Sequence, residues 1–302
     1  MASIKNLTQI TKKITPMTDN IFVFDRNIIR TKRNRAAAHL KDHGFLFDWS
    51  ATQISERLEL IKKDFPLTLQ IGNRTNKINI PNSKIITFDN ASALNADIMG
   101  EEEILPFQQN SFDLVVSPLN LHSVNDLPGA LSQINHCLKP DGLFIATLFG
   151  GETLYELRQI MNEVELSQTG GMHPRIFPFA DLPQMGALMQ RSNFNLPVID
   201  SEKITVTYDN AFKLMKDLRL MGEGNSIIAR QKKFTTRQFF QDVAVQYADK
   251  FNEPDGRIKA TFEIIFVLGW KHHESQQKPL RPGSAKNRLS EALATSEEKL
   301  PI

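Results

Sequence analysis

The chain has 302 residues, which is enough to bury a full core in one large domain or in one domain with an insertion. Its 41% hydrophobic and 23% charged residues are ordinary for a soluble globular protein, and a formal net charge of +2 is too small to indicate a nucleic-acid partner. The single cysteine, Cys137, excludes a disulfide framework and a cysteine-based zinc site and suits a reducing compartment.

The two ends of the chain carry no segment that predicts a membrane span or a signal peptide. Residues 1–20 lack an apolar run, and no window reaches the length of a transmembrane helix. A basic cluster follows, and it is open to interpretation as a solvated helix face or as a peripheral membrane or partner contact: Arg26, Arg30, Lys32, Arg33 and Arg35. Residues 274–302 are polar and contain prolines, which predicts a disordered tail.

An N-terminal helical segment over residues 1–65 precedes a series of alternating strands and helices. Ser50 and Gln53 form a capping-box pattern that predicts the start of a helix. Apolar runs at 67–71, 84–88, 112–117 and 143–149 predict buried strands, and Asp126 predicts the cap of a helix over 127–138. Such alternation predicts a parallel sheet covered by helices on both faces.

The second half of the chain predicts further helices and two strands. Thr153 with Glu156, and Asp181 with Gln184, form two more capping-box patterns. Residues 198–208 and 260–270 predict strands, with helices at 211–221 and 235–251 between them. We interpret the stretch at about 209–256 as a helical insertion in one domain that spans residues 66–273.

Four short blocks occur in order along the predicted sheet, at 101–107, 110–113, 121–126 and 138–142. This series resembles the class I S-adenosylmethionine-dependent methyltransferases, in particular the small-molecule branch with BioC-like enzymes. Further blocks at 149–158, 221–225 and 269–276 resemble the NADH dehydrogenase (complex I) assembly factor 5 family. That resemblance covers nearly the whole chain and implies a Rossmann-like, seven-stranded sheet whose last strand is antiparallel.

The resemblance implies S-adenosyl-L-methionine as the cofactor, bound where the strands end. The matching positions are Gly72, Asp89, Glu101, Leu105, Ser117 and Asn120. A carboxylate at Asp89 would accept hydrogen bonds from ribose hydroxyls, and a strand-end turn is the alternative. Glu101 matches the position near the adenine amino group, with a solvated run of charges as its alternative.

The loop after the first strand departs from the methyltransferase pattern. That pattern has an acidic residue followed by Gly-x-Gly-x-Gly, because glycine lets the backbone approach the cofactor. Here only Gly72 remains, and Arg74 and Asn76 fill the other glycine positions. Gln70 replaces the carboxylate. The departure supports an alternative in which the fold is kept as a non-catalytic binding protein.

Residues after the fourth strand predict the substrate side of the pocket. Gly150, Gly151 and Glu152 precede a helix N-terminus, where backbone N–H groups can meet an anionic or carbonyl group, although the glycines can also simply supply a turn. The candidates for catalysis are His122, Tyr155 and Arg158, each with a structural role as its alternative. No recognised metal-ligand spacing is present, and no metal is predicted.

Three functions are compatible with these features. The first is an S-adenosylmethionine-dependent methyltransferase that acts in complex I assembly, or on a small molecule or a protein side chain. The second follows from the resemblance alone and is hydroxylation of an arginine in a complex I subunit, which would be the protein partner. The third is a non-catalytic assembly protein. The expected location is the cytoplasm of a bacterium, with peripheral contact at the inner membrane, or the matrix side in a mitochondrion.

Overall fold

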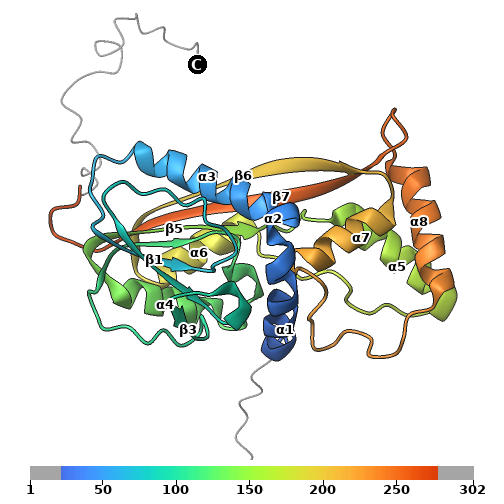
Figure 1. The fold of residues 1–302 in the computed structure, drawn as a ribbon, viewed down its shortest axis with the longest axis horizontal. Coiled ribbons are helices and arrows are strands. Elements are labelled where there is room, and N and C mark those ends of the chain that lie inside the picture. The colour runs from blue at the N-terminus through green and yellow to red at the C-terminus, as the bar shows by residue number, and fades with distance from the viewer. Residues whose placement is uncertain (1–21, 278–302) are drawn as a thin grey trace, which may run out of the picture.

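One seven-stranded sheet organises the chain in the computed structural model, which describes residues 22–277 (Figure 1). The strand order is β3-β2-β1-β4-β5-β7-β6. The strands are β1 (Leu67–Ile71), β2 (Lys84–Asp89), β3 (Ile98–Met99), β4 (Phe112–Ser117), β5 (Leu138–Phe149), β6 (Phe194–Tyr208) and β7 (Ile258–Lys271). Neighbours from β3 to β5 pair in parallel, and β7 is antiparallel to both β5 and β6. The predicted sheet with an antiparallel last strand is confirmed. The predicted tail of residues 274–302 falls, from residue 278 on, outside the described residues.

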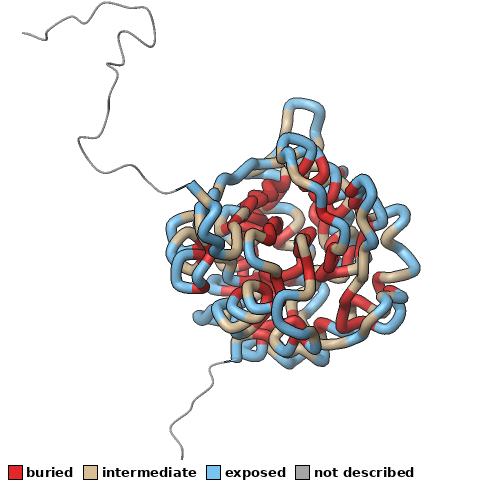
Figure 2. Tube along the Cα trace, turned by 90° about the vertical axis from the view of Figure 1, so that its left-hand side faces the viewer, coloured by how far each residue is buried: buried red, intermediate tan, exposed pale blue. Residues whose placement is uncertain are grey.

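Helices cover both faces of this sheet, as predicted. They are α1 (Arg26–Ala36), α2 (Leu40–His43), α3 (Phe45–Glu59), α4 (Leu127–Cys137), α5 (Tyr155–Thr169), α6 (Leu182–Arg191), α7 (Ala211–Leu220) and α8 (Arg237–Phe251). Because side chains alternate along a strand, Val116 packs in a cluster with Ile54 of α3, while Val115 packs with Leu131 of α4 on the opposite face. Figure 2 shows the buried residues gathered inside this layered arrangement.

The helices α5, α7 and α8 gather at one end of the long β6–β7 pair (Figure 1). Their apolar faces share a core with β7 that contains Leu157, Leu214, Val243 and Phe262. The chain leaves β6, forms α7 and α8, and returns as β7. None of the helices between residues 22 and 277 has the length and apolar character that crossing a bilayer requires.

The predicted helix caps divide into two groups. Asp126 caps α4 by accepting the N–H of Gly129 at 2.9 Å, and Asp181 with Gln184 forms the predicted capping box of α6. The predicted starts at Ser50 and Thr153 are wrong. α3 begins five residues earlier, at Phe45, and α5 begins at Tyr155 without a side-chain cap. Both hydroxyls bind distant strands instead: Ser50 contacts Thr147 Oγ1 at 2.5 Å, and Thr153 donates to the carbonyl of Glu263 at 3.0 Å.

Candidate functional site

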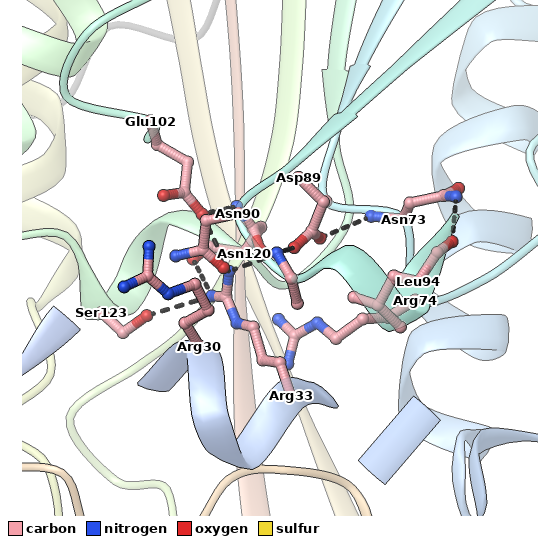
Figure 3. A network of polar contacts seen from close by, with 12 residues as sticks. Arg30, Arg33, Asn73, Arg74, Asp89, Asn90, Leu94, Glu102, Asn120 and Ser123 are labelled. Atoms are coloured by element: carbon pink, nitrogen blue, oxygen red, sulfur yellow. Dashed lines mark hydrogen bonds and ion pairs between the residues drawn. The ribbon is translucent and has the colours of Figure 1, made fainter. Parts of the chain in front are cut away.

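The carboxyl ends of β1, β2 and β4 meet at one edge of the sheet (Figure 3). Gly72 follows β1 with a φ of +92°, and a Cβ there would lie 2.8 Å from the side chain of Asn120. Asp89 ends β2, is fully buried, and accepts the N–H groups of Asn73 and Ala91, each at 2.9 Å. The structure therefore brings together Gly72, Asp89 and Asn120, which the sequence places 48 residues apart at most.

The residues at these strand ends form the strand-end pocket. A side chain from α1 lies at its centre. Arg33 is only 2% exposed, and its guanidinium lies 2.9 Å from Glu102 Oε1 and 3.9 Å from Asp89 Oδ1. It also donates to Asn90 Oδ1 at 3.2 Å and to Ser123 Oγ at 3.3 Å. Figure 3 shows Arg33 rising from α1 between these groups. The predicted basic cluster is thus neither a uniform solvated face nor a free basic surface, because one of its members is buried.

Glu102 is the carboxylate that faces the pocket, and Glu101 lies at its rim. Glu102 is fully buried and binds both Arg33 and Arg26. Burial alone would raise the pKa of Glu102, but these two guanidinium groups lower it to about 2. Glu101 is about one third exposed and pairs with Arg26 and Arg30 of α1.

Two further predicted cofactor residues are buried beside the pocket. The side chain of Leu105 packs in the apolar cluster on the α4 face, and its N–H donates to Gln133 at 2.8 Å. Ser117, the last residue of β4, is fully buried, and its hydroxyl has no hydrogen-bond partner among the described residues.

A second buried group, on the side of the pocket toward α7, contains Arg74, Glu223 and His122. Arg74 binds Glu223 and the carbonyl of Leu119, and its guanidinium stacks 4.1 Å from the centre of the Phe47 ring. His122 Nε2 lies 3.1 Å from Glu223 Oε2. Burial alone would raise the pKa of Glu223, but His122 and Arg74 hold it well below its usual range. Glu223 is therefore an anion at neutral pH.

His122 is held in its neutral form. Burial lowers the pKa of His122, and this outweighs the opposing effect of Glu223. Because a carboxylate only accepts hydrogen bonds, Nε2 of the neutral ring carries the proton that it donates to Glu223. Nδ1 is then an acceptor, and it has no partner in the described part of the chain. The ring packs against Phe149, with 4.7 Å between centres.

A mostly apolar cavity of about 220 Å³ lies next to this group. Its aromatic wall comes from β5, β7, α8 and the segment before α6, and it includes Phe149, Phe177, Phe179, Phe240 and Phe262. Glu223 also lines this cavity, although its side chain is largely buried. This carboxylate therefore connects the cavity with the strand-end pocket.

The predicted substrate residues lie beside this cavity. A Cβ on Gly150 would be 2.5 Å from the carboxylate of Glu263, so a larger residue there would displace this side chain of β7. The same carboxylate accepts the N–H of Glu152 at 2.9 Å. Gly151 has open space around its Cα. The side chain of Glu152 is exposed and pairs with Lys203.

The other two catalytic candidates sit on α5 outside the cavity lining. Tyr155 is 37% exposed and meets Phe251 of α8 edge to face. Arg158 donates to the carbonyls of Gly151 and Thr153, each at 2.8 Å, and so closes the turn before the helix. Of the three candidates, His122 alone is in contact with Glu223.

Comparison with known proteins identifies the relatives of this chain. A family model described as a methyltransferase domain matches residues 76–146. The mitochondrial arginine-hydroxylase NDUFAF5 of Mus musculus is 40% identical, over 87% of this chain and 81% of the relative. The chain belongs to the NDUFAF5 family. The malonyl-[acyl-carrier protein] O-methyltransferase of Xylella fastidiosa is 28% identical over 82% of this chain and 88% of its own.

Solved structures include a match to the YcgJ protein of Bacillus subtilis. It has a TM-score of 0.49 and 15% identity, and it covers 74% of this chain and 98% of that one. Family membership confirms the resemblance predicted from the sequence blocks, and the methyltransferase domain supports S-adenosylmethionine as the cofactor.

The polar groups of the strand-end pocket suit this cofactor, but the pocket has no room for it. Asp89, Glu102 and the amides of Asn90 and Asn120 provide acceptors for a cationic, donor-rich nucleoside. Two buried oxygens that lack a hydrogen-bond partner among residues 22–277, Ser117 Oγ and Asn120 Oδ1, lie at the same edge. The room between these groups, however, is filled by Arg33. With Arg33 in place the pocket does not fit the cofactor.

Sequence reasoning did not single out Arg33, Glu102 or Glu223 as site residues. A signal for Arg33 existed, because it stands on the same helical face as Ile29 and Ala36, the other buried residues of α1. Glu102 was hidden in a run of three glutamates, and Glu223 lay in a block used only for its family resemblance. In the range 22–277, no group of three or more acidic, histidine or cysteine side chains is arranged to hold a metal.

Proposed function

We propose that this chain acts in the assembly of respiratory complex I by taking an arginine side chain of a complex I subunit into the aromatic cavity, where it is modified. The observation that carries this proposal is the position of Glu223 on the wall of a mostly apolar cavity. An arginine has an apolar stem and a cationic end, and the cavity offers a surface to each. Relatives in the same family are named arginine-hydroxylases.

The chemistry of the cavity wall suits a guanidinium. Each oxygen of a carboxylate accepts more than one hydrogen bond, so Glu223 retains acceptor capacity beside Arg74 and His122. Aromatic faces attract a desolvated cation by about 2 kcal/mol. Arg175, which also lines the cavity, is neutralised by its pairing with Glu165 at 2.7 Å and offers little repulsion.

The residues of this chain bind and orient the substrate in this proposal. His122 acts as a positioning residue, since its Nε2–H fixes one oxygen of Glu223. The mass of the modified arginine shows whether it has been methylated or hydroxylated. Methylation would use S-adenosylmethionine, the cofactor that the methyltransferase domain indicates, as the methyl donor. Hydroxylation would require an oxidant. We place the activity at the cytoplasmic side of the inner membrane in a bacterium, or at the matrix side in a mitochondrion.

Mass spectrometry of complex I subunits tests this function. A strain that lacks the gene is complemented with the wild-type chain, with Met215→Trp, or with Phe212→Trp. Met215 lines the cavity, whereas Phe212 is exposed on the same helix α7, so the second variant controls for the change of residue type. With the wild type and Phe212→Trp we expect an arginine heavier by one CH2 unit, if a methyl group has replaced a hydrogen, or by one inserted oxygen atom. With Met215→Trp we expect an unmodified arginine. Identical subunit masses in wild-type and deletion strains would remove the proposal.

A second candidate function is binding without chemistry, and the observation that favours it is Arg33 in the strand-end pocket. A protein of this kind would hold the same arginine in the cavity as a step of assembly. The same experiment separates the two candidates. Loss of assembled complex I in the deletion strain and with Met215→Trp, with no change in any arginine mass, would select the binding function.

A further inference from the structure

The place that the methyltransferase fold gives to its cofactor is occupied by the Arg33 side chain of helix α1. In open α/β sheets a ligand binds at the carboxyl ends of the strands where the strand order reverses, which here is the edge between β1 and β4. Arg33 reaches Asp89 at the end of β2, Asn90 directly after it, and the carbonyl of Asn120 after β4 at 3.5 Å. These are the groups that would otherwise line the pocket.

The charge of Arg33 resembles that of the cofactor it displaces. S-adenosylmethionine carries a sulfonium, an ammonium and a carboxylate group, so its net charge is one positive charge, as in Arg33, and its ribose and adenine donate hydrogen bonds. Arg33 satisfies Glu102 and Asn90 with a tethered cation in the same way. A buried carboxylate cannot be left unpaired without a large cost. Withdrawal of Arg33 therefore leaves the acidic site without this partner, and a cationic nucleoside can then fill it.

The attachment of α1 to the rest of the chain is mostly polar. Only Ile29, Arg33 and Ala36 of its residues are buried. Ile29 belongs to a small apolar cluster with Phe24, Phe177 and Ile227, separate from the three larger clusters of the fold. Removing α1 from its place exposes little apolar surface compared with removal of any helix that covers the sheet.

Contacts of α1 and of the residues just before it connect this helix to the residues next to the cavity. The N–H of Asp25 donates to the carbonyl of Ser226 at 2.8 Å, and the N–H of Ile228 donates to the carbonyl of Val23 at 2.9 Å. Lys32 binds the carbonyl of Asn225, a residue of the cavity lining. Movement of α1 would thus shift residues of the cavity that the proposed substrate enters.

We infer that α1 is an autoinhibitory element, in which Arg33 holds the cofactor pocket closed and a cationic nucleoside binds only when α1 withdraws. This inference concerns the cofactor side of the site and does not depend on the arginine-binding cavity. The affinity measured for a ligand is its intrinsic affinity reduced by the fraction of open molecules. Removing the side chain that favours the closed form therefore raises affinity.

The test uses the full chain with S-adenosylmethionine as the probe. Calorimetry compares the wild type with Arg33→Ala and with Arg35→Ala, which changes an exposed arginine on the same helix. We expect Arg33→Ala to bind about tenfold tighter or better, since the closed form is no longer favoured, and Arg35→Ala to match the wild type. If Arg33→Ala does not fold, Arg33→Lys replaces it, because lysine keeps the charge but cannot bridge two acceptors with a planar fork.

Hydrogen exchange of the wild-type chain gives a direct second reading. With saturating ligand, amides of residues 26–36 should exchange faster, while those near Gly72 and Asp89 exchange more slowly. Ligand binding that leaves α1 exchange unchanged or slower would overturn the inference. Absence of binding to every one of these proteins at millimolar ligand would overturn it as well, since the pocket would then not be a cofactor site. Neither result alters the arginine mass measured in the subunits, although absence of binding would exclude S-adenosylmethionine as its methyl donor.

Discussion

The ion pair between Arg33 and Glu102 should be among the most costly in the chain to break from one side. At 2.9 Å and an effective dielectric constant of about 20, Coulomb attraction between the two groups is about 6 kcal/mol. Most of it is offset by the loss of hydration of both charges. Removing one partner leaves the other buried without compensation, which costs about 3–5 kcal/mol. For Arg33→Met we expect the lower end of this range, because Arg26 also binds Glu102.

A double-mutant cycle with Arg33→Met and Glu102→Gln measures this coupling. The free energy of unfolding comes from urea denaturation at neutral pH, and we expect the double variant to lose about 2–3 kcal/mol less than the sum of the two single losses. Arg30 of the same helix and its partner Glu101 provide the matched control, since their groups are 3.8 Å apart and both partly exposed. Their coupling should be below about 1 kcal/mol. Single losses under about 1 kcal/mol for Arg33→Met and Glu102→Gln would refute the view that this pair anchors α1.

The pH dependence of stability gives an independent measure of the same pair. The pKa of Glu102 falls from its usual value of 4.5 to about 2, so the folded chain releases this proton more readily than the unfolded chain. Its contribution is complete above about pH 4.5 and is lost as the pH falls toward 2, by up to about 3 kcal/mol. Glu102→Gln should remove that part of the acid loss. An unchanged acid slope in the variant would contradict the assigned pKa.

Two further predictions concern a glycine and a lysine. Gly150→Ala should cost about 1–3 kcal/mol in urea denaturation, because the new Cβ meets Glu263, whereas Gly151→Ala, which meets nothing within 4 Å, should be near neutral. Equal losses for the two variants would argue against the close packing of Gly150. Burial and the nearby Arg230 lower the pKa of Lys32 to about 8, so the unfolded chain binds more protons between pH 8 and 10.5. Stability of the wild type relative to Lys32→Met should therefore rise across that interval, and a flat difference would show that Lys32 is not buried as described.

The strands and layers of the fold were predictable because each depends on a local pattern. Runs such as 112–117 are apolar on both faces, as a covered parallel strand requires, and Asp126 caps a helix three residues before the group that it binds. The start of α3 was not predictable from Ser50. Its hydroxyl binds Thr147, which is 97 residues away, and no local pattern reports such a partner.

The same distinction separates the parts of the site. The meeting of Gly72, Asp89 and Asn120 follows from parallel strands that end at one edge, and it could be expected from the sequence. Glu223 comes from a segment 149 residues away from Arg74, and Arg33 comes from a helix 69 residues before Glu102. Both depend on where separate elements dock. The burial of Glu223 and Arg33 therefore could not be predicted from local sequence, apart from the buried helical face on which Arg33 lies.

The altered glycine loop takes on a physical meaning once these long-range contacts are known. Arg74, which stands at a glycine position of the methyltransferase pattern, binds Glu223 and stacks on Phe47, so it contributes to the buried charge network. Arg33 does the same for Glu102. Restoring glycine at position 74 would leave Glu223 with His122 as its remaining partner and would still leave Arg33 between the strand ends. The loop alone therefore does not decide whether the pocket is open. Whether the pocket is open depends on the position of α1, since its Arg33 is the group that a cofactor must replace.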